Sequence, residues 1–518
     1  TGGTNTGSTD TGGTNTGSTD TGGTDTGSTD NGGTDTGSTD TGGTDTGSTD
    51  NGGTDTGSTD TGGTDTGSTD TGGTSTGTTD TGGTTTGTTG GTTTGTTTGT
   101  TGGTTGGTTS GGPSTTTGGS TTPPSGQVWP SVGAVLASGQ LQGGDRIFLM
   151  DGYHGAISFQ GMRFSTPIVV APVAGEVAHV DSILIRGSSN IVFQGLKVWA
   201  TSANAGTGPL IRSYGDTSDL AFTDLDVRGV SSSANYMQWA QTDWQNYKRD
   251  GLMIDGDSVT IARNRLTGIF HGIKSVASNT LMEENIIDGF AGDGMRANGD
   301  NSIVRKNKVQ NCFAISANHM DGFQSFSTGS GGKVGTGTVK NLTVEDNKIF
   351  EWTSTSTNPL RCKLQGISMF DGMYDGIVIR NNVISTRAYH GISINGAINT
   401  LVVNNTVVDA NGANAKWPWI RLSPHKNGTP SQNTTFANNL VNGNKVTADT
   451  SRNIVSANNV IVINAASEFS SVAQQDFSLK STAKAANAGL AKYAPQLDII
   501  GTARPLGKAP DAGAYENF

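Results

Sequence analysis

The sequence predicts an all-β protein, in which a solenoid of stacked β-coils follows a disordered low-complexity segment. A short strand pattern with an asparagine at its corner recurs along the second part of the chain, with no helical pattern between the copies. Residues 1–126, in contrast, contain 13 Asp but no Lys, Arg or Glu, and they repeat a decapeptide of Thr, Gly, Ser and Asp. We therefore predict a disordered segment over 1–126 and a β-solenoid domain over 127–518.

The formal charge of −11 is the sum of two unlike parts. Residues 1–126 carry −13, and the remaining 30 acidic and 32 basic residues leave the body near +2. A nucleic-acid-binding protein needs a basic surface that releases counterions, so a near-neutral body argues against that function. The absence of any run of about 18 apolar residues argues against a membrane-spanning helix. We therefore expect neither nucleic acid nor a membrane as a partner.

The N-terminal segment cannot bury apolar surface against the entropy of ordering, which is why disorder is predicted for it. A glycine-rich coil of this length has a root-mean-square span on the order of 60 Å. Calcium binding by its Asp residues and glycosylation of its Thr residues are alternative roles for the segment. All three interpretations suit a protein that is secreted or held at the cell surface.

The body begins with a capping segment of helical spacing over 129–141 and continues as short alternating strands. Its later copies join two short strands at a polar corner. The short spacings between the corner asparagines are 20 to 23 residues, and the spacings of 34, 35 and 40 are the same unit with inserted loops. Stacked coils would place neighbouring strands about 4.8 Å apart in parallel sheets. We expect a ladder of amide–amide hydrogen bonds at Asn264, Asn285, Asn307, Asn347, Asn382, Asn405, Asn439 and Asn459.

The repeat also carries a family resemblance. Residues 342–349 and 377–384 read [Leu/Ile/Val]-x-[Ile/Val]-x-x-Asn-x-[Val/Ile], which resembles the right-handed parallel β-helix repeat of the pectate-lyase-like superfamily. Residues 505–516 resemble the closing segment of such secreted proteins, and 144–153 resemble the first coil of alginate-lyase-like and C5-epimerase-like members. The resemblance spans residues 127–518 and implies a right-handed parallel β-helix. The implied activities are those of polysaccharide lyases, C5-epimerases, glycoside hydrolases, tailspikes and adhesins.

A second phrase recurs six times: a polar residue, glycine, an apolar residue and another polar residue. Glycine there allows a bend at the corner or the close approach of a ligand. Strand alternation turns the last residue outward, so the copies build one polar column along the stacked coils. The inward members are Leu252, Ile273, Met295, Phe323, Ile367 and Ile392. The outward members are Met253, Lys274, Arg296, Gln324, Ser368 and Ser393, preceded before each glycine by Asp250, His271, Asp293, Asp321, Gln365 and His390.

This column supplies the candidate catalytic residues. Stacking would place Asp293 and Asp321 on successive rungs, with His319 two residues before Asp321. Asp250 and His390, near the ends of the column, are expected to be structural. The candidate catalytic residues are His319, Asp321, Arg296, Asp293, His271 and Lys274.

Long inserted loops flank the column at 229–249, 325–340, 351–364 and 410–433. They carry aromatic side chains, on which sugar rings stack, and basic side chains, which suit carboxylated sugars. The alternative is that the aromatic side chains cover the side of the solenoid and the charges are solvated. The candidate substrate-binding residues are Gln324, Arg361, Lys363, Trp244, Trp352, Trp417, Trp419 and Arg421.

Three functions compete for this column. In a lyase or C5-epimerase, His319 or His271 would remove the C5 proton of a uronate while Arg296, Lys274 and Gln324 hold its carboxylate. In a glycoside hydrolase, Asp293 and Asp321 would be the paired carboxylates. In an adhesin or tailspike-type protein, the column would bind glycan or build a surface without chemistry.

The leading prediction is a secreted monomer that acts on an acidic polysaccharide by β-elimination or C5 epimerisation. No metal-ligand set is assigned, and Ca²⁺ held by Asp293 or Asp321 is the one cofactor left open. The two cysteines, Cys312 and Cys362, are compatible with one disulfide and equally with two free thiols.

Overall fold

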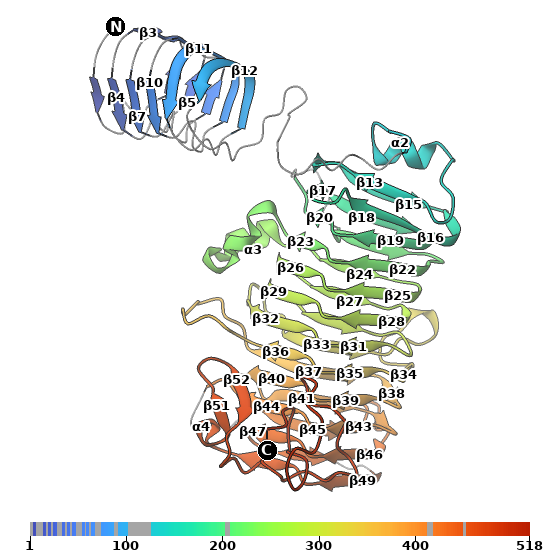
Figure 1. Cartoon of the computed structure of the whole chain (residues 1–518). Coiled ribbons are helices and arrows are strands. Elements are labelled where there is room, and N and C mark those ends of the chain that lie inside the picture. Colours follow the sequence, from blue (N-terminus) through green and yellow to red (C-terminus); the bar gives the residue numbers. More distant parts are fainter. Residues whose placement is uncertain are drawn as a thin grey trace. The chain divides into compact units, whose positions relative to one another are not determined.

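The computed structural model describes the body of the protein over residues 126–201, 208–411, 418–448 and 452–517. Of residues 1–125 it describes the backbone of twelve short strands, β1 (Thr4–Thr6) to β12 (Thr92–Thr101). Contacts divide the chain into two compact units, Thr1–Thr122 and Pro123–Phe518, and both are drawn in Figure 1.

The strands of the first unit pair in parallel, with Thr4 beside Thr24 and Thr44 beside Thr64, so that each step is two decapeptides. Residues 1–126 contain no apolar side chain except proline, so no hydrophobic core supports this pairing. The residues that join the strands and all side chains of this unit lie outside the described residues. The disorder predicted for 1–126 therefore concerns mostly residues that the structure does not describe.

The body is a parallel β-helix, which confirms the predicted right-handed parallel β-helix fold (Figure 1). Most coils give one strand to each of three parallel sheets, which have 15, 12 and 11 strands among the described residues. The repeat pattern alone predicts two kinds of sheet in each coil. The structure has three because the asparagine corner separates two sheets that the sequence pattern had merged.

We number the sheets in chain order. Sheet 1 contains β13 (Arg146–Leu149), β16 (Arg163–Pro172), β19 (Ser189–Gln194), β22 (Ser218–Thr223), β25 (Asp257–Ala262), β28 (Ser278–Glu283), β31 (Ile303–Arg305), β35 (Thr343–Glu345), β39 (Val378–Arg380), β43 (Leu401–Val403), β46 (Gln432–Ala437) and β49 (Arg452–Ala457), with the branch β42 (Ala397–Ile398), β38 (Met373–Asp375) and β34 (Thr338–Lys340). Sheet 2 contains β14 (Gly152–Tyr153), β17 (Ala178–Val180), β20 (Lys197–Val198), β23 (Asp226–Arg228), β26 (Arg265–Ile269), β29 (Ile286–Phe290), β32 (Lys308–Cys312), β36 (Lys348–Phe350), β40 (Val383–Thr386), β44 (Thr406–Asp409), β47 (Leu440–Asn442) and β50 (Val460–Val462). Sheet 3 contains β15 (Ala156–Gln160), β18 (Ser182–Arg186), β21 (Ile211–Tyr214), β24 (Leu252–Ile254), β27 (Ile273–Ser275), β30 (Met295–Ala297), β33 (Met320–Phe326), β37 (Leu364–Asp371), β41 (His390–Asn395), β45 (Trp419–Ser423) and β48 (Val446–Ala448).

Short helices and a hairpin cover the ends and sides of the β-helix. Helix α2 (Val132–Ala137) lies within the predicted capping segment and buries Val132 and Val135 against the core. Helices η1 (Ser231–Gln238) and α3 (Gln241–Tyr247) form the loop before β24, and η2 (Ser330–Gly332) lies in the loop after β33. Helix α4 (Ala465–Glu468) and the antiparallel pair β51 (Phe469–Ser471) and β52 (Asp476–Leu479) follow the last coils. Among the described residues, no helix is long and apolar enough to cross a membrane.

The predicted asparagine ladder is confirmed at all eight positions. Each amide before Asn459 donates to the Oδ1 atom of the asparagine in the next coil, as Asn285 Nδ2 does to Asn307 Oδ1 at 2.9 Å. Its second hydrogen goes to a backbone carbonyl, Ile261 O at 2.8 Å for Asn285. The other links are Asn264–Asn285, Asn307–Asn347, Asn347–Asn382, Asn382–Asn405, Asn405–Asn439 and Asn439–Asn459. Buried amides are stable here because every donor has a partner.

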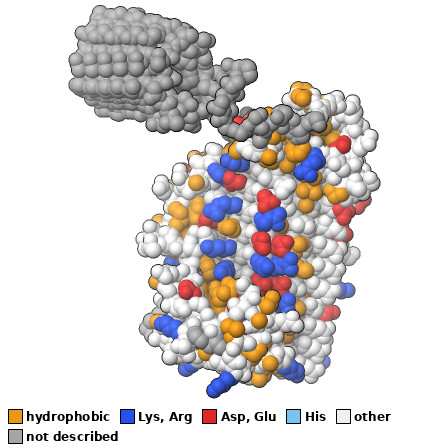
Figure 2. Space-filling view, viewed as in Figure 1, with side chains coloured by type: hydrophobic (Ala, Val, Ile, Leu, Met, Phe, Trp, Pro, Cys, Tyr) orange, Lys and Arg blue, Asp and Glu red, His pale blue; other side chains and the backbone are white. Residues whose placement is uncertain are grey.

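The outer face of sheet 1 carries ion pairs between neighbouring coils. Arg305 lies 2.7 Å from Glu283, and Arg380 lies 2.6 Å from Glu345. Figure 2 shows columns of alternating basic and acidic side chains running along the body. Partly exposed pairs of this kind contribute little to the free energy of unfolding.

Candidate functional site

The register of sheet 3 aligns the predicted polar column. Successive strands pair Met253 with Lys274, Lys274 with Arg296, and Arg296 with Gln324. The same outward row continues through Ser368 and Ser393 to Arg421. The predicted inward residues Leu252, Ile273, Met295, Phe323, Ile367 and Ile392 are all 0% exposed. Of the predicted outward residues, Met253, Lys274, Arg296 and Gln324 are at least partly exposed, whereas Ser368 and Ser393 are buried.

The coils can stack closely only because the recurring phrase has glycine at its second position. A Cβ atom on Gly272 would lie 2.2 Å from the carbonyl oxygen of Gly294, and one on Gly366 would lie 2.3 Å from that of Gly391. Glycine therefore lets one coil approach the next along this row. The sequence had suggested a bend at the corner or the close approach of a ligand; at these positions the group that comes close is instead the backbone of the next coil.

Asp250, His271 and Lys274 form the first cluster of the column. His271 Nδ1 lies 2.8 Å from Asp250 Oδ1, and Lys274 donates to Asp250 Oδ2 at 3.2 Å. Burial alone would raise the pKa of Asp250, but the hydrogen bond from His271 and the two nearby positive charges lower it to about 2. Asp250 thus stays ionised and fixes the orientation of the His271 ring.

Asp293 and Arg296 form the second cluster, one rung further on. Arg296 pairs with the Asp293 carboxylate, and His271 Nε2 lies 4.0 Å from the same carboxylate. Asp293 is 3% exposed and accepts the backbone N–H of Asp321 at 3.3 Å. Burial, followed by the negative charge of Asp321, raises the pKa of Asp293.

Asp321, His319 and Gln324 form the third cluster. Asp321 is 0% exposed, and its Oδ2 atom accepts from Gln324 at 2.9 Å and lies 3.1 Å from His319 Nδ1. The His319 side chain, in contrast, is 55% exposed. Its hydrogen bond to Asp321 raises the pKa of His319 above the ordinary histidine value. The arrangement presents one imidazole to solvent and anchors it on a buried carboxylate.

The row ends in an aromatic and basic cluster. Trp419 Nε1 donates to Ser393 Oγ at 3.2 Å, and the Trp419 ring centroid lies 5.0 Å from that of Tyr389. The Arg421 guanidinium lies 5.8 Å from the centre of the Trp419 ring. Burial, then the positive charges of Arg421 and His319, lower the pKa of His390 to about 4, so this ring is neutral near pH 7. Tyr389, which is 47% exposed, was missed by the sequence analysis although it directly precedes the His390 copy of the glycine phrase.

Two of the predicted sugar-binding tryptophans are instead part of a buried aromatic cluster. Trp244 is 0% exposed and Trp352 is 8% exposed, packed with Tyr236, Trp239 and Phe313. This cluster covers sheet 2 rather than the column, because the loop containing η1 and α3 rests on glycines of that sheet. A Cβ atom on Gly289 would lie 2.6 Å from the Tyr236 ring, and one on Gly268 would lie 2.9 Å from Trp239. The alternative of aromatic side chains covering the solenoid therefore holds for Trp244 and Trp352.

The remaining predicted substrate-binding residues are dispersed. Lys363 is exposed and directly precedes β37, where the register pairs Leu364 with Met320, so Lys363 lies level with His319. Arg361 is held away from the column by an ion pair of 2.8 Å with Glu351. Trp417 lies outside the described residues.

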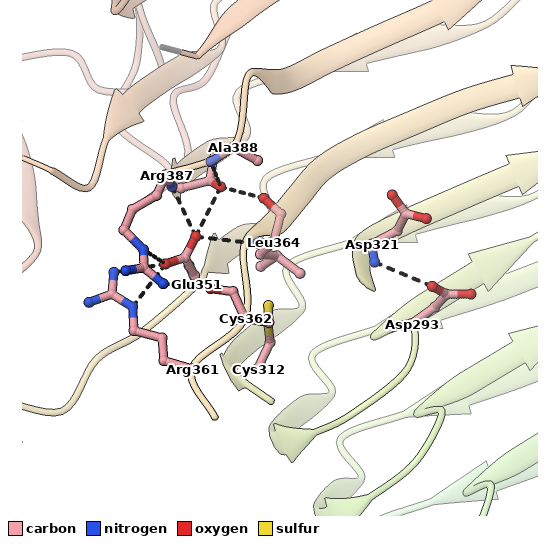
Figure 3. Close-up of a disulfide and its surroundings, with 10 residues drawn as sticks. Asp293, Cys312, Asp321, Glu351, Arg361, Cys362, Leu364, Arg387 and Ala388 are labelled. Carbon is pink, nitrogen blue, oxygen red and sulfur yellow. Dashed lines mark hydrogen bonds and ion pairs between the residues drawn. A yellow bond between two sulfur atoms is a disulfide. The ribbon is translucent and has the colours of Figure 1, made fainter. Parts of the chain in front are cut away.

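Glu351 is the centre of a buried ionic cluster that the sequence analysis did not find. It is 0% exposed and pairs with Arg361 and, at 2.5 Å, with Arg387. The Oε2 atom of Glu351 also accepts the backbone N–H groups of Leu364 and Arg387, at 3.2 and 2.9 Å. Figure 3 shows this cluster beside a disulfide and apart from the two aspartates of the column.

The disulfide joins Cys312 and Cys362 across 50 residues of chain, with their Cα atoms 5.5 Å apart. It settles the alternative that the sequence left open. Together with the Glu351 cluster, it fixes the segment that leads into β37 of sheet 3. Among the residues that the structure describes, no group of three or more His, Cys, Asp or Glu side chains could hold a metal ion.

Comparison with solved structures finds β-helix proteins at low similarity. A pectate lyase, Pel9A, is 16% identical and covers 74% of this chain and 90% of its own, with a TM-score of 0.33. An exopolygalacturonase from Thermotoga maritima is 13% identical over 63% of this chain and 85% of its own, with a TM-score of 0.36. An alginate lyase of family PL6 in complex with a trisaccharide is 14% identical over 64% and 83%, with a TM-score of 0.39.

No protein-family model matches the sequence, and the comparison with curated proteins gives no match either. What can be stated of the body from its own sheets is therefore the fold, which is a parallel β-helix.

Proposed function

We propose that the protein acts on an acidic polysaccharide by β-elimination or C5 epimerisation, with His319 as the group that moves the proton. The observation that carries this proposal is the geometry of His319, a half-exposed imidazole bound through Nδ1 to the fully buried carboxylate of Asp321. With Nδ1 engaged, Nε2 is the atom left to meet a substrate. The neighbouring rung supplies the cation Arg296.

The proposed chemistry follows from these positions. Nε2 of neutral His319 takes the C5 proton of a uronate, while Arg296 and Gln324 stabilise the negative charge that develops on the sugar carboxylate. In β-elimination, the electrons of the C5–H bond form a C4=C5 double bond and the C4–O bond breaks. The leaving oxygen then takes a proton from His319 or from Lys274. In epimerisation, C5 instead takes a proton from a water molecule on its opposite face, and His319 returns its proton to the hydroxide that this leaves.

Asp293 and Asp321 act in this proposal as positioning residues. Asp293 is 3% exposed and Asp321 is 0% exposed, so neither carboxylate can touch a glycosidic oxygen in this arrangement. Asp321 orients His319 and Gln324, and Asp293 orients Arg296. Their burial weighs against the alternative of a glycoside hydrolase with paired aspartates.

The test is incubation of the purified protein with alginate, pectate and other uronans. Ultraviolet absorbance of an unsaturated product together with new reducing ends identifies a lyase. New ends without that absorbance identify a hydrolase and overturn the proposal. Inverted C5 signals in the sugar NMR spectrum, without new ends, identify an epimerase. Binding with no change in any of these readouts supports the adhesin and also overturns the proposal.

The pH profile gives a more specific prediction. Because Asp321 raises the pKa of His319, the neutral base is formed only above the ordinary histidine value of about 6.5, and kcat/KM should rise with pH through that range. Asp321→Asn removes the negative charge, so the rising limb should move to lower pH while the maximal rate falls. The measurement is kcat/KM between pH 5 and 9. An unshifted limb in the variant would show that His319 is not the titrating base.

The aromatic cluster at the end of the row should bind a sugar remote from the reacting one. It lies three strands beyond β33, which is on the order of 14 Å at the usual strand spacing. Trp419→Ala should raise KM about tenfold for long oligouronates and leave KM for a disaccharide unchanged. Tyr153→Ala, a change of an exposed aromatic on a distant early coil, is the matched control. Equal effects on long and short substrates would contradict a remote subsite.

We also propose that the protein works outside the cell or at its surface. Disulfides persist in oxidising compartments, and the Cys312–Cys362 bond supports such a location. The Thr- and Gly-rich composition of residues 1–126 suits a tether or stalk on the same side.

A further inference from the structure

A polar cavity lies on sheet 2, away from the column of sheet 3. Its volume is about 430 Å³, and its walls come from β32, β36, the corners before them and the C-terminal segment at 497–501. That volume is sufficient for a small ligand. The charged side chains that line it are Lys306, Lys308, Lys348, Asp346 and Asp498.

Two lysines of this cavity are stacked on adjacent strands, and the opposing charges near Lys348 come from Asp476 and Asp498 on other segments. Lys308 and Lys348 are paired in register on adjacent strands, and like charges in that position repel. The outward row continues to Ile286 on one side and Val383 on the other, so the sheet itself offers no acid beside them. Within the described part of the chain, neither ammonium group, nor that of Lys306, forms an ion pair or a hydrogen bond. Burial, followed by the charge of Lys308, lowers the pKa of Lys348.

Two acidic residues line the cavity beside the three lysines. Asp498 is 3% exposed, and its carboxylate already accepts the backbone N–H groups of Ile500, Thr502 and Glu516 at 2.9, 2.7 and 3.0 Å. Asp346 has one carboxylate oxygen that is buried without a hydrogen-bond partner, and burial raises its pKa to about 6. Among the residues that line the cavity, three lysines therefore face two aspartates.

We propose that this cavity binds an oxyanion, either a free inorganic anion or the carboxylate of an acidic sugar. Lys308 and Lys348 would donate to its oxygens from adjacent rungs, and Lys306 would donate from the corner of the coil. Ammonium groups bind oxyanions through charge-assisted hydrogen bonds, and an anion here would relieve the repulsion between the stacked lysines. The inference is independent of any activity at the column on sheet 3.

The experiment is calorimetric titration of the full chain at pH 7 and constant ionic strength, with inorganic phosphate in one arm and glucuronate in the other. At least one anion should bind the wild type with a single-site isotherm. Lys308→Met and Lys348→Met keep the apolar stem of each lysine and should each weaken binding about tenfold. Lys333→Met, a change of an exposed lysine in a distant loop, is the matched control and should bind like the wild type.

A further variant separates lost binding from lost stability. Asp346→Asn removes a negative charge that interacts with Lys306 in the cavity, so it should tighten anion binding several-fold where a merely destabilised protein would bind more weakly. Binding of phosphate identifies a site for free anions, and binding of glucuronate alone identifies a site for a sugar carboxylate. No binding in either arm, or equal binding by wild type, Lys308→Met and Lys348→Met, would overturn the proposal.

Discussion

Replacing His319 with alanine is expected to lower turnover of the uronan substrate by about 10²- to 10⁴-fold, which is the usual contribution of a general base. The loss should appear in kcat, because His319 acts on the C5 proton rather than on the bulk of the polymer. Its side chain is 55% exposed, so the change should not disturb the folded state. The measurement is kcat and KM on the uronan that the wild type degrades or epimerises.

The matched control is His154→Ala, which removes a histidine from an early coil, where His154 Nε2 lies 2.8 Å from the carbonyl oxygen of Met150. This variant should retain wild-type kcat. Arg296→Ala tests the second part of the mechanism and should also lower kcat, because Arg296 is expected to stabilise charge that develops in the transition state. Full turnover by His319→Ala would show that the base lies elsewhere on the column, with His271 the next residue to examine.

Replacing Glu351 with alanine is expected to lower the free energy of unfolding by about 3 to 5 kcal/mol, the usual consequence of removing one partner from a buried ionic cluster. The change leaves Arg361 and Arg387 without their shared carboxylate, and leaves the backbone N–H of Leu364 without an acceptor. The measurement is urea denaturation of the oxidised protein, followed by circular dichroism.

Glu283→Ala is the matched control because Glu283 pairs with one arginine, Arg305, on the face of sheet 1, and both side chains are partly exposed. That variant should lose about 1 kcal/mol or less. If the two variants were equally stable, the Glu351 cluster would not be the ionic support of β37 that its burial indicates.

The sequence predicted the parts of the fold that repeat. The asparagine ladder was predictable because Asn285, Asn307 and their equivalents recur at the corner of every coil, and a repeated corner must stack on itself. The polar column was predictable for the same reason, since the glycine phrase gives the position of each outward side chain along sheet 3. Stacking alone was enough to bring His319, Asp321 and Arg296 onto adjacent rungs.

The sequence could not predict what the inserted loops cover, because no repeat constrains them. Trp244 looks like an exposed sugar platform when only its position in a polar loop is known. Its burial depends on Gly268 and Gly289, which leave room on sheet 2 for the aromatic rings of that loop. The ionic cluster of Glu351 was missed for the same reason, because Arg361 and Arg387 lie in different connections and meet only in the folded chain.

The hydrogen bonds of the asparagine ladder all run in one direction along the chain. This direction matters for the number of coils that such a β-helix needs. Each amide donates toward the C-terminal neighbour. At the last position, Asn459 donates one amide hydrogen to Phe436 O at 3.0 Å, as the other rungs do to their carbonyls, and its amide also donates to Ser456 Oγ at 3.2 Å. At the first position, Asn264 Oδ1 accepts the backbone N–H of Leu225 at 2.9 Å. Both ends are therefore satisfied locally, whatever number of rungs lies between them. A whole coil could be gained or lost as a unit without orphaning an amide, and doing so between β33 and β45 would change the spacing between His319 and Trp419 by one rung.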